Sequence, residues 1–134
     1  MKFTGGAPPT VLVVDDDADC RECVRDLLEG SGFVVAEATN GQTALERLES
    51  MPHVVVVVLD LEMPVMNGHE LVRIMKENPR LSRLQVLILS GSISVSPRDP
   101  PISGLFNKPC DPKHLIAAVE ACILRDDVRN DGRQ

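Results

Sequence analysis

The stretch Val-Val-Val-Val-Val-Leu-Asp at residues 54–60 decides the fold of this chain. Its six consecutive apolar residues, most of them β-branched, favour a strand that is covered on both faces, as in the centre of a parallel sheet. Asp60 follows directly, and burial penalises the charge of a carboxylate unless a partner stabilises it. The stretch therefore predicts a buried central strand with a polar site at its carboxyl end.

Strand-like and helix-like segments alternate on either side of this stretch. Apolar runs predict further strands at residues 10–14, 33–38, 85–89 and 104–107. Apolar residues at helical spacing lie between the strands; the first helix is expected to be capped by Asp19 and the last by Asp111. This alternation implies right-handed crossovers and a doubly wound, five-stranded parallel sheet with helices on both faces.

Polar side chains follow four of the predicted strands. The aspartates at 15–17 follow the first strand and Asp60 follows the third, while Ser90 and Lys108 end the fourth and fifth. The carboxyl ends of parallel strands meet at one edge of a sheet, so we expect these residues to converge there. Clustered carboxylates repel one another, and a hard divalent cation such as Mg²⁺ relieves the repulsion.

Charge counting supports a magnesium site that serves phosphoryl transfer. Asp15, Asp16 and Asp60 contribute three negative charges, Lys108 contributes one positive charge, and one Mg²⁺ brings the sum to neutrality. Such a site neutralises phosphoryl oxygens while a carboxylate attacks, which is chemistry that depends mostly on positioning and electrostatics. A hydroxyl such as that of Ser90 is able to bond a phosphoryl oxygen.

Four ordered motifs resemble the receiver domains of two-component response regulators, which are flavodoxin-like (βα)5 folds of the chemotaxis type. They are Val-Leu-Val-Val-Asp-Asp-Asp (11–17), Val-Leu-Asp-Leu-Glu-Met-Pro-Val-Met-Asn-Gly (58–68), Leu-Ile-Leu-Ser-Gly (87–91) and Lys-Pro (108–109). The resemblance covers residues 10–124. Residues 1–9 are expected to be a flexible leader and residues 125–134 a polar tail.

The resemblance assigns a role to each polar strand end. It implies that Asp60 is the phosphoacceptor, that Asp16 binds Mg²⁺ directly and that Asp15 binds it largely through water. The backbone carbonyl of Glu62 is implied as a further ligand. Ser90 is then the switch hydroxyl, and Lys108 holds the phosphoryl group.

The resemblance also implies partners and a mode of action. A sensor histidine kinase or a histidine phosphotransfer protein would supply the phosphoryl group, and an unidentified protein would respond to it. We do not expect an enzyme in the usual sense, since a receiver catalyses only its own phosphorylation and dephosphorylation. A small phosphatase with an aspartyl-phosphate intermediate shares this chemistry and remains an alternative.

Two departures from the family pattern motivate a second alternative. Prolines at 97, 100 and 101 predict that the fourth helix is degenerate or missing. The position that commonly holds the switch aromatic is Leu105, and Phe106 comes one residue later. A pseudo-receiver, an interaction module with this fold and no phosphorylation-driven switching, therefore stays open.

Bulk properties exclude several other classes. The net charge of −6, without a run of basic residues, argues against direct binding to nucleic acid. No apolar run is long enough to span a bilayer, no signal peptide is recognisable, and the low cysteine density favours a reducing cytoplasm. Cys20 and Cys23 have redox-motif spacing, but their acidic neighbours do not favour a reactive thiol, so two small helix residues are expected, with at least Cys20 packed inward.

Overall fold

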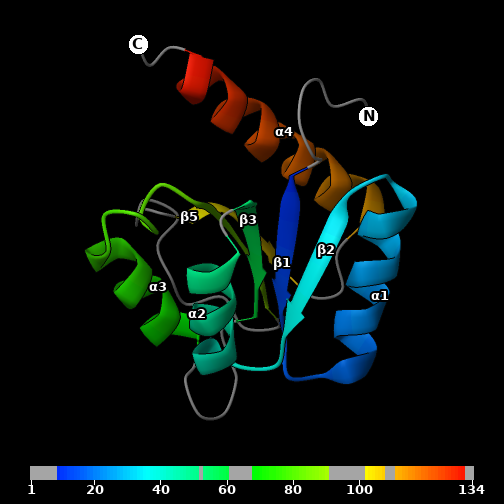
Figure 1. Ribbon diagram of the computed structural model, residues 1–134. Helices are drawn as coiled ribbons and strands as arrows, with labels where there is room; N and C mark the ends of the chain where they lie inside the picture. The colour runs from blue at the N-terminus through cyan, green and yellow to red at the C-terminus, as the bar shows by residue number, and fades with distance from the viewer. Residues whose placement is uncertain (1–8, 52, 61–67, 91–101, 108–110, 132–134) are drawn as a thin grey trace.

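The structure, a computed structural model, describes residues 9–51, 53–60, 68–90, 102–107 and 111–131. Strands alternate with helices along most of this chain, and all strand pairs are parallel. The sheet order is β2-β1-β3-β4-β5 (Figure 1). The elements are β1 (Thr10–Val14), α1 (Ala18–Gly30), β2 (Val34–Ala38), α2 (Gly41–Ser50), β3 (Val54–Leu59), α3 (Gly68–Glu77), β4 (Gln85–Ser90), β5 (Ile102–Asn107) and α4 (Pro112–Asp131).

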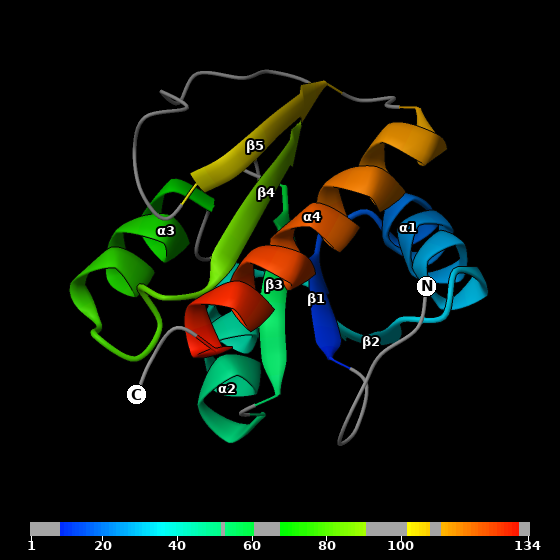
Figure 2. The ribbon, with the colours of Figure 1, turned by 90° about the horizontal axis from the view of Figure 1, so that it is seen from above.

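The two faces of the sheet are covered by different helices, as the continuous apolar strands predict. One core cluster joins β1 and β3 to α2 and α3 through residues such as Leu12, Leu59 and Met75. The other joins the opposite face to α1 and α4 through residues such as Val13 and Leu115. Figures 1 and 2 show α2 and α3 on one side of the sheet and α1 and α4 on the other. The doubly wound parallel arrangement is therefore confirmed.

The expected degenerate or missing helix falls between β4 and β5, at residues 91–101, which lie outside the described part of the chain. Its prediction therefore stays a prediction. The leader expected at residues 1–9 also lies outside the described residues, except for Pro9.

Strand β3 contains one irregularity that its valine run conceals. Val54 and Val56 lie opposite consecutive residues of β1, so Val55 is an extra residue in the pairing. Such a bulge interrupts the alternation of side chains between the two faces. As a result Val54 packs in the same cluster as Val57 and Leu59, although strict alternation would place Val54 and Val57 on opposite faces.

Helix α1 begins at a different capping residue from the one expected. The carboxylate of Asp17 accepts hydrogen bonds from the backbone N–H groups of Asp19 and Cys20, at 2.9 and 3.2 Å. The prediction that Asp19 caps the helix is therefore wrong. Asp17 has the extended backbone from which a side chain reaches back to the free N–H groups of the first turn.

A Schellman motif ends α1. Gly32 has a φ of +97°, its N–H donates to Glu29, and the N–H of Phe33 donates to the carbonyl of Leu28. Leu28 and Phe33 are both buried in the same core cluster. The motif therefore turns the chain directly from α1 into β2.

Helix α4 confirms the predicted cap and apolar stripe but extends further than expected. The carboxylate of Asp111 accepts from the N–H of Lys113 at 2.9 Å, and the stripe is buried at Leu115, Val119, Cys122 and Ile123. The helix continues through residues 125–131 of the expected polar tail, because no glycine or proline interrupts the chain before Gly132. In the part of the chain that is described, no helix has both the length and the apolar character of a membrane span.

Candidate metal centre

Backbone pairing positions two carboxylates at the carboxyl edge of the sheet. The N–H of Asp15, directly after β1, donates to the carbonyl of Ala38 at 3.1 Å. The N–H of Asp60, directly after β3, donates to the carbonyl of Val14 at 2.9 Å. The parallel pairing thus extends one residue beyond each strand, and it fixes the two aspartates side by side.

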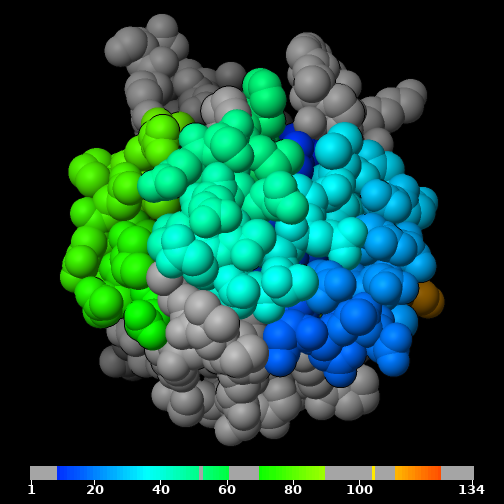
Figure 3. All heavy atoms as spheres, turned by 60° about the horizontal axis from the view of Figure 1, so that its bottom comes forward, coloured from blue at the N-terminus to red at the C-terminus, as the bar shows by residue number. Residues whose placement is uncertain are grey.

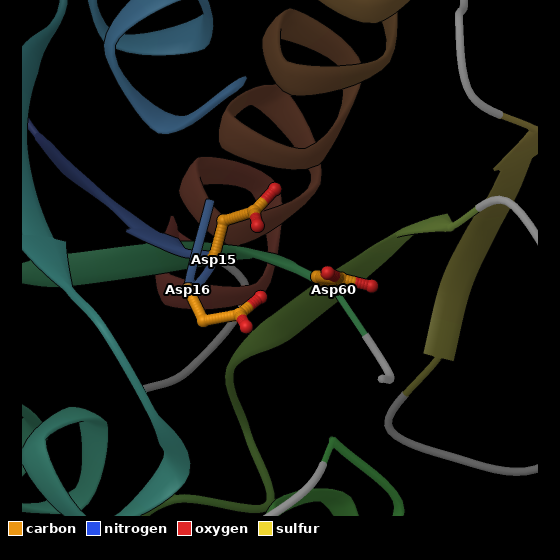
Figure 4. A group of neighbouring side chains, drawn as sticks. All are labelled: Asp15, Asp16 and Asp60. Atoms are coloured by element: carbon orange, nitrogen blue, oxygen red, sulfur yellow. The ribbon is translucent and has the colours of Figure 1, made fainter. Parts of the chain in front are cut away.

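Asp15, Asp16 and Asp60 form the acidic cluster at this edge (Figure 4). One carboxylate oxygen from each residue lies within 4.8 Å of the other two. Asp15 and Asp60 are 4% and 7% exposed, whereas Asp16 is exposed. The convergence predicted from the strand ends is therefore observed for these three residues.

The donor set of the acidic cluster fits a hard divalent cation. Oxygen atoms are the ligands that Mg²⁺ prefers, and three carboxylates at this separation repel one another strongly when two of them are buried. A divalent cation at their centre would make the net electrostatic energy of the cluster favourable, because its attraction to each carboxylate outweighs their mutual repulsion. Side-chain oxygen atoms, charge and burial thus agree with the metal site inferred from sequence.

Local hydrogen bonds shape the segment between β1 and α1. The Oδ1 atom of Asp15 accepts from the N–H of Asp17 at 2.9 Å, and Asp17 in turn caps α1. These two consecutive turns leave Asp16 between them, on the surface. Figure 3, with this edge turned forward, shows the start of α1 beside β2 and α2 on that surface.

Arg21 and Glu37 also belong to the surroundings of the site, although sequence reasoning did not select them. The Nη1 atom of Arg21 donates to the backbone carbonyl of Asp15 at 3.0 Å, and its Nε donates to Oε1 of Glu37 at 3.0 Å. Arg21 stands four residues after Asp17, which is helical spacing from the cap. That spacing, together with a lone acid in the apolar strand β2, is the signal that would have found the pair.

A second arginine binds the other oxygen of the same carboxylate. The Nη1 atom of Arg25 donates to Oε2 of Glu37 at 3.2 Å. Hydrogen bonds to Asp26 and, next, to Glu37 raise the pKa of Arg25 above its ordinary value. Arg25 therefore shares a partner with Arg21, but its own partners among the described residues are Asp26, Glu29 and Glu37 and not the segment that carries Asp15.

The remaining predicted site residues are described only in part. Glu62 and Lys108 lie outside the described residues. Ser90 is the last residue of β4, opposite Asn107 of β5, so its backbone ends a strand as predicted. In the same register Leu105 lies opposite Ile88.

Of the two cysteines of α1, only Cys20 was required by the prediction to pack inward. Cys20 is half-buried and Cys23 is exposed. Neither of the two forms a disulfide.

An open parallel α/β sheet with an acidic cluster at its carboxyl edge is the architecture of a flavodoxin-like receiver. The sequence profile of the response regulator receiver domain family matches residues 11–120. The chain therefore belongs to the family of response regulator receiver domains of two-component systems, and the resemblance inferred from its motifs is confirmed.

Relatives with similar sequences include two response regulators of rice and a protein of Leptolyngbya boryana. The chain is 42% identical over 86 residues to the two-component response regulator ORR11 of rice. This match covers 64% of this chain and 58% of ORR11. It is 41% identical over 93 residues to the rice response regulator ORR5, with 69% of each protein covered. An uncharacterised 14.6 kDa protein of Leptolyngbya boryana is 36% identical over 119 residues, 85% of this chain and 89% of that protein. The match thus spans little more than half the length of ORR11.

Solved structures agree on the fold. The chemotaxis protein CheY4 of Vibrio cholerae has a TM-score of 0.78 and 27% identity, and the match covers 87% of this chain and 99% of CheY4. The receiver domain of a LuxO repressor protein from Vibrio parahaemolyticus has a TM-score of 0.86. That match covers 96% of this chain and 99% of the Vibrio domain. Its identity is 18%, so the second likeness concerns the fold alone.

Proposed function

We propose that this receiver accepts a phosphoryl group on Asp60 and passes the signal on through contacts with another protein. The donor would be the phosphohistidine of a sensor histidine kinase or a histidine phosphotransfer protein, in a cytoplasmic phosphorelay. The observation that carries the proposal is the acidic cluster, in which a buried carboxylate at the end of β3 lies beside two others from the end of β1. Membership in the receiver family supports the same chemistry.

The carboxylates of Asp15, Asp16 and Asp60 are the residues that would hold Mg²⁺, and the resemblance adds the backbone carbonyl of Glu62. When bound, Mg²⁺ would supply positive charge against the phosphoryl oxygens and the acidic cluster together. Without that charge, three carboxylates would repel an incoming anionic phosphoryl group. The acidic cluster therefore makes acceptance of phosphate depend on the cation.

The transfer itself exchanges one bond for another. An oxygen of Asp60 attacks the phosphorus atom, the bond from phosphorus to the imidazole nitrogen breaks, and the electron pair returns to that nitrogen, which takes up a proton. In this proposal the hydroxyl of Ser90 and the ammonium group of Lys108 bond phosphoryl oxygens on the acceptor side. Hydrolysis of the acyl phosphate restores the carboxylate, so the receiver turns over only its own phosphoryl group.

The test is phosphorylation of the purified protein by a small acyl-phosphate donor with Mg²⁺, followed by intact-mass spectrometry. We expect a gain of one phosphoryl group in the native protein and none in Asp60→Asn. Asp17→Asn is the matched control, because asparagine caps a helix as well as aspartate does and Asp17 lies outside the acidic cluster. This control should be phosphorylated like the native protein.

Each alternative predicts a different outcome, and the phosphatase alternative is tested with a small phosphate ester as a second substrate. A folded protein that gains no mass with Mg²⁺ would be a pseudo-receiver, and the phosphoacceptor proposal would fall. Repeated turnover of a phosphate ester at a rate well above decay of the acyl phosphate would identify a phosphatase. A single gain that requires Asp60 and Mg²⁺ supports the proposal.

A further inference from the structure

We propose that Arg21 is a positioning residue of the acidic cluster: it holds the backbone of Asp15 against β2 and thereby sets the carboxylates for the cation. The inference rests on the proposed function, because it assumes that the acidic cluster binds Mg²⁺. It adds a residue from α1 that bonds the backbone of Asp15 and none of the three carboxylates of the acidic cluster.

The two donors of Arg21 serve two different elements. Nη1 binds the carbonyl of Asp15 at 3.0 Å, while Nε binds Glu37 in β2 at 3.0 Å. The side chain is 15% exposed, so water competes weakly for both bonds. Because the fork of a guanidinium is rigid, the position of Glu37 fixes the direction of the bond to Asp15.

The bonded carbonyl belongs to the peptide group that joins Asp15 to Asp16. Restraining this peptide restrains the backbone origin of two of the three carboxylates in the acidic cluster. Asp15 is additionally held on its side chain by the N–H of Asp17. Arg21 therefore restrains the backbone of this segment, while the N–H of Asp17 restrains the side chain of Asp15. Asp16, which lies between these two bonds, is exposed.

Glu37 is itself held in place from several directions. Arg25 binds its second oxygen at 3.2 Å, and the Nε atom of Arg47 in α2 donates to its backbone carbonyl at 3.2 Å. A carboxylate fixed in this way is a stable anchor for Arg21. Arg25 is the natural comparison, because it carries the same charge to the same anchor without the bond to Asp15.

Charge and geometry predict opposite effects when Arg21 is removed. Loss of a positive charge near three carboxylates strengthens their attraction for a cation, so electrostatics alone predicts tighter binding of Mg²⁺. Loss of a positioning bond weakens it, because outer partners of metal ligands typically contribute about tenfold or more to affinity. The sign of the change therefore separates the two roles.

The experiment is calorimetric titration of the full chain with MgCl₂ in its native form, as Arg21→Gln and as Arg25→Gln. We expect the dissociation constant for Mg²⁺ to rise about tenfold in Arg21→Gln, and to stay level or fall slightly in Arg25→Gln. Arg21→Lys retains the charge without the rigid fork and should show a smaller rise; it replaces Arg21→Gln if that variant does not fold. Binding by Arg21→Gln or Arg21→Lys that is as tight as in the native protein overturns the inference and leaves the proposed function standing.

A second measurement tests the positioning without any metal. Hydrogen exchange at the N–H of Asp17, which bonds the side chain of Asp15, should accelerate in Arg21→Gln and not in Arg25→Gln. If the native protein binds no Mg²⁺, the metal site of the proposed function falls, and exchange alone decides the role of Arg21. Unchanged exchange in Arg21→Gln would overturn the inference.

Discussion

Asp60 combines two properties that oppose each other in a folded protein. It is a charged residue that directly follows Leu59, a core residue with no exposed surface, and it is itself only 7% exposed. Asp15, only 4% exposed, belongs to the same acidic cluster. Placing such charges together lowers the free energy of unfolding. Clustered, buried carboxylates of this kind are typical of functional sites, so we attribute this cost to the function of the site.

The first prediction concerns this cost. Asp60→Asn should raise the free energy of unfolding of the metal-free protein by about 1–2 kcal/mol, because a neutral side chain of similar shape ends the repulsion within the acidic cluster. The measurement is urea denaturation in the presence of a chelator.

The control for this prediction is again Asp17→Asn, which removes a charge outside the acidic cluster. Its free energy of unfolding should stay within about 0.5 kcal/mol of the native value, since both residues cap helices well. A clear loss of stability in Asp60→Asn would show that contacts of the charged group outweigh the repulsion.

At the scale of elements, how much the sequence predicts depends on how distinctive the local signal is. The strand ends that carry Asp15 and Asp60 were predictable because apolar runs stop at charged residues. The bulge at Val55 was not, because a run of identical valines contains no information on register, and the pairing with β1 decides it. Arg21 was missed for a related reason: its spacing from Asp17 and the lone acid Glu37 in β2 point only to an ion pair, and a bond to a backbone carbonyl leaves no pattern of its own in the sequence.

Helix ends show the same limit. Several aspartates precede α1, and sequence alone did not distinguish Asp17 from Asp19 as the cap, since either can accept backbone bonds. The end of α1 was predictable, because Gly30 and Gly32 mark it, although only the structure shows which of the two glycines adopts a positive φ.

The second prediction uses these two glycines. A Cβ atom would meet nothing within 4 Å at either position, so steric contact does not distinguish them. Gly32→Ala should lower the free energy of unfolding by about 1–2 kcal/mol, because its φ of +97° disfavours an L-residue. Gly30→Ala, at the last residue of the helix, should raise it by up to about 0.5–1 kcal/mol. Thermal unfolding of both variants measures the difference, and equal effects would contradict the Schellman assignment.

At the scale of the whole molecule, two separate cores hold one sheet between them. Residues of β1 and β3 alternate between the cluster under α2 and α3 and the cluster under α1 and α4. Neither core is complete without the sheet, so disruption of one face should destabilise the entire domain. Helix α4 contributes its buried stripe to only one of these cores.

The third prediction compares two leucines of α4. Leu115 is 1% exposed and Leu124 is 55% exposed. Leu115→Ala should lower the free energy of unfolding by about 2–5 kcal/mol through lost burial and the cavity left behind. Leu124→Ala should change it by less than about 0.5 kcal/mol, as is usual for surface positions. Denaturant unfolding of both proteins provides the measurement, and similar losses would show that the outer face of α4 is covered in solution.

The backbone bonds of Asp15 and Asp60 to neighbouring strands give the acidic cluster two kinds of member. The backbones of these two aspartates are bonded to the sheet, whereas Asp16 is exposed in the segment between β1 and α1. Divalent cations differ in ionic radius, and an accommodating site must lengthen some of its metal–oxygen distances. When a larger ion replaces Mg²⁺, we therefore expect Asp16 to shift most, while the carboxylates of Asp15 and Asp60 keep their positions at the strand ends.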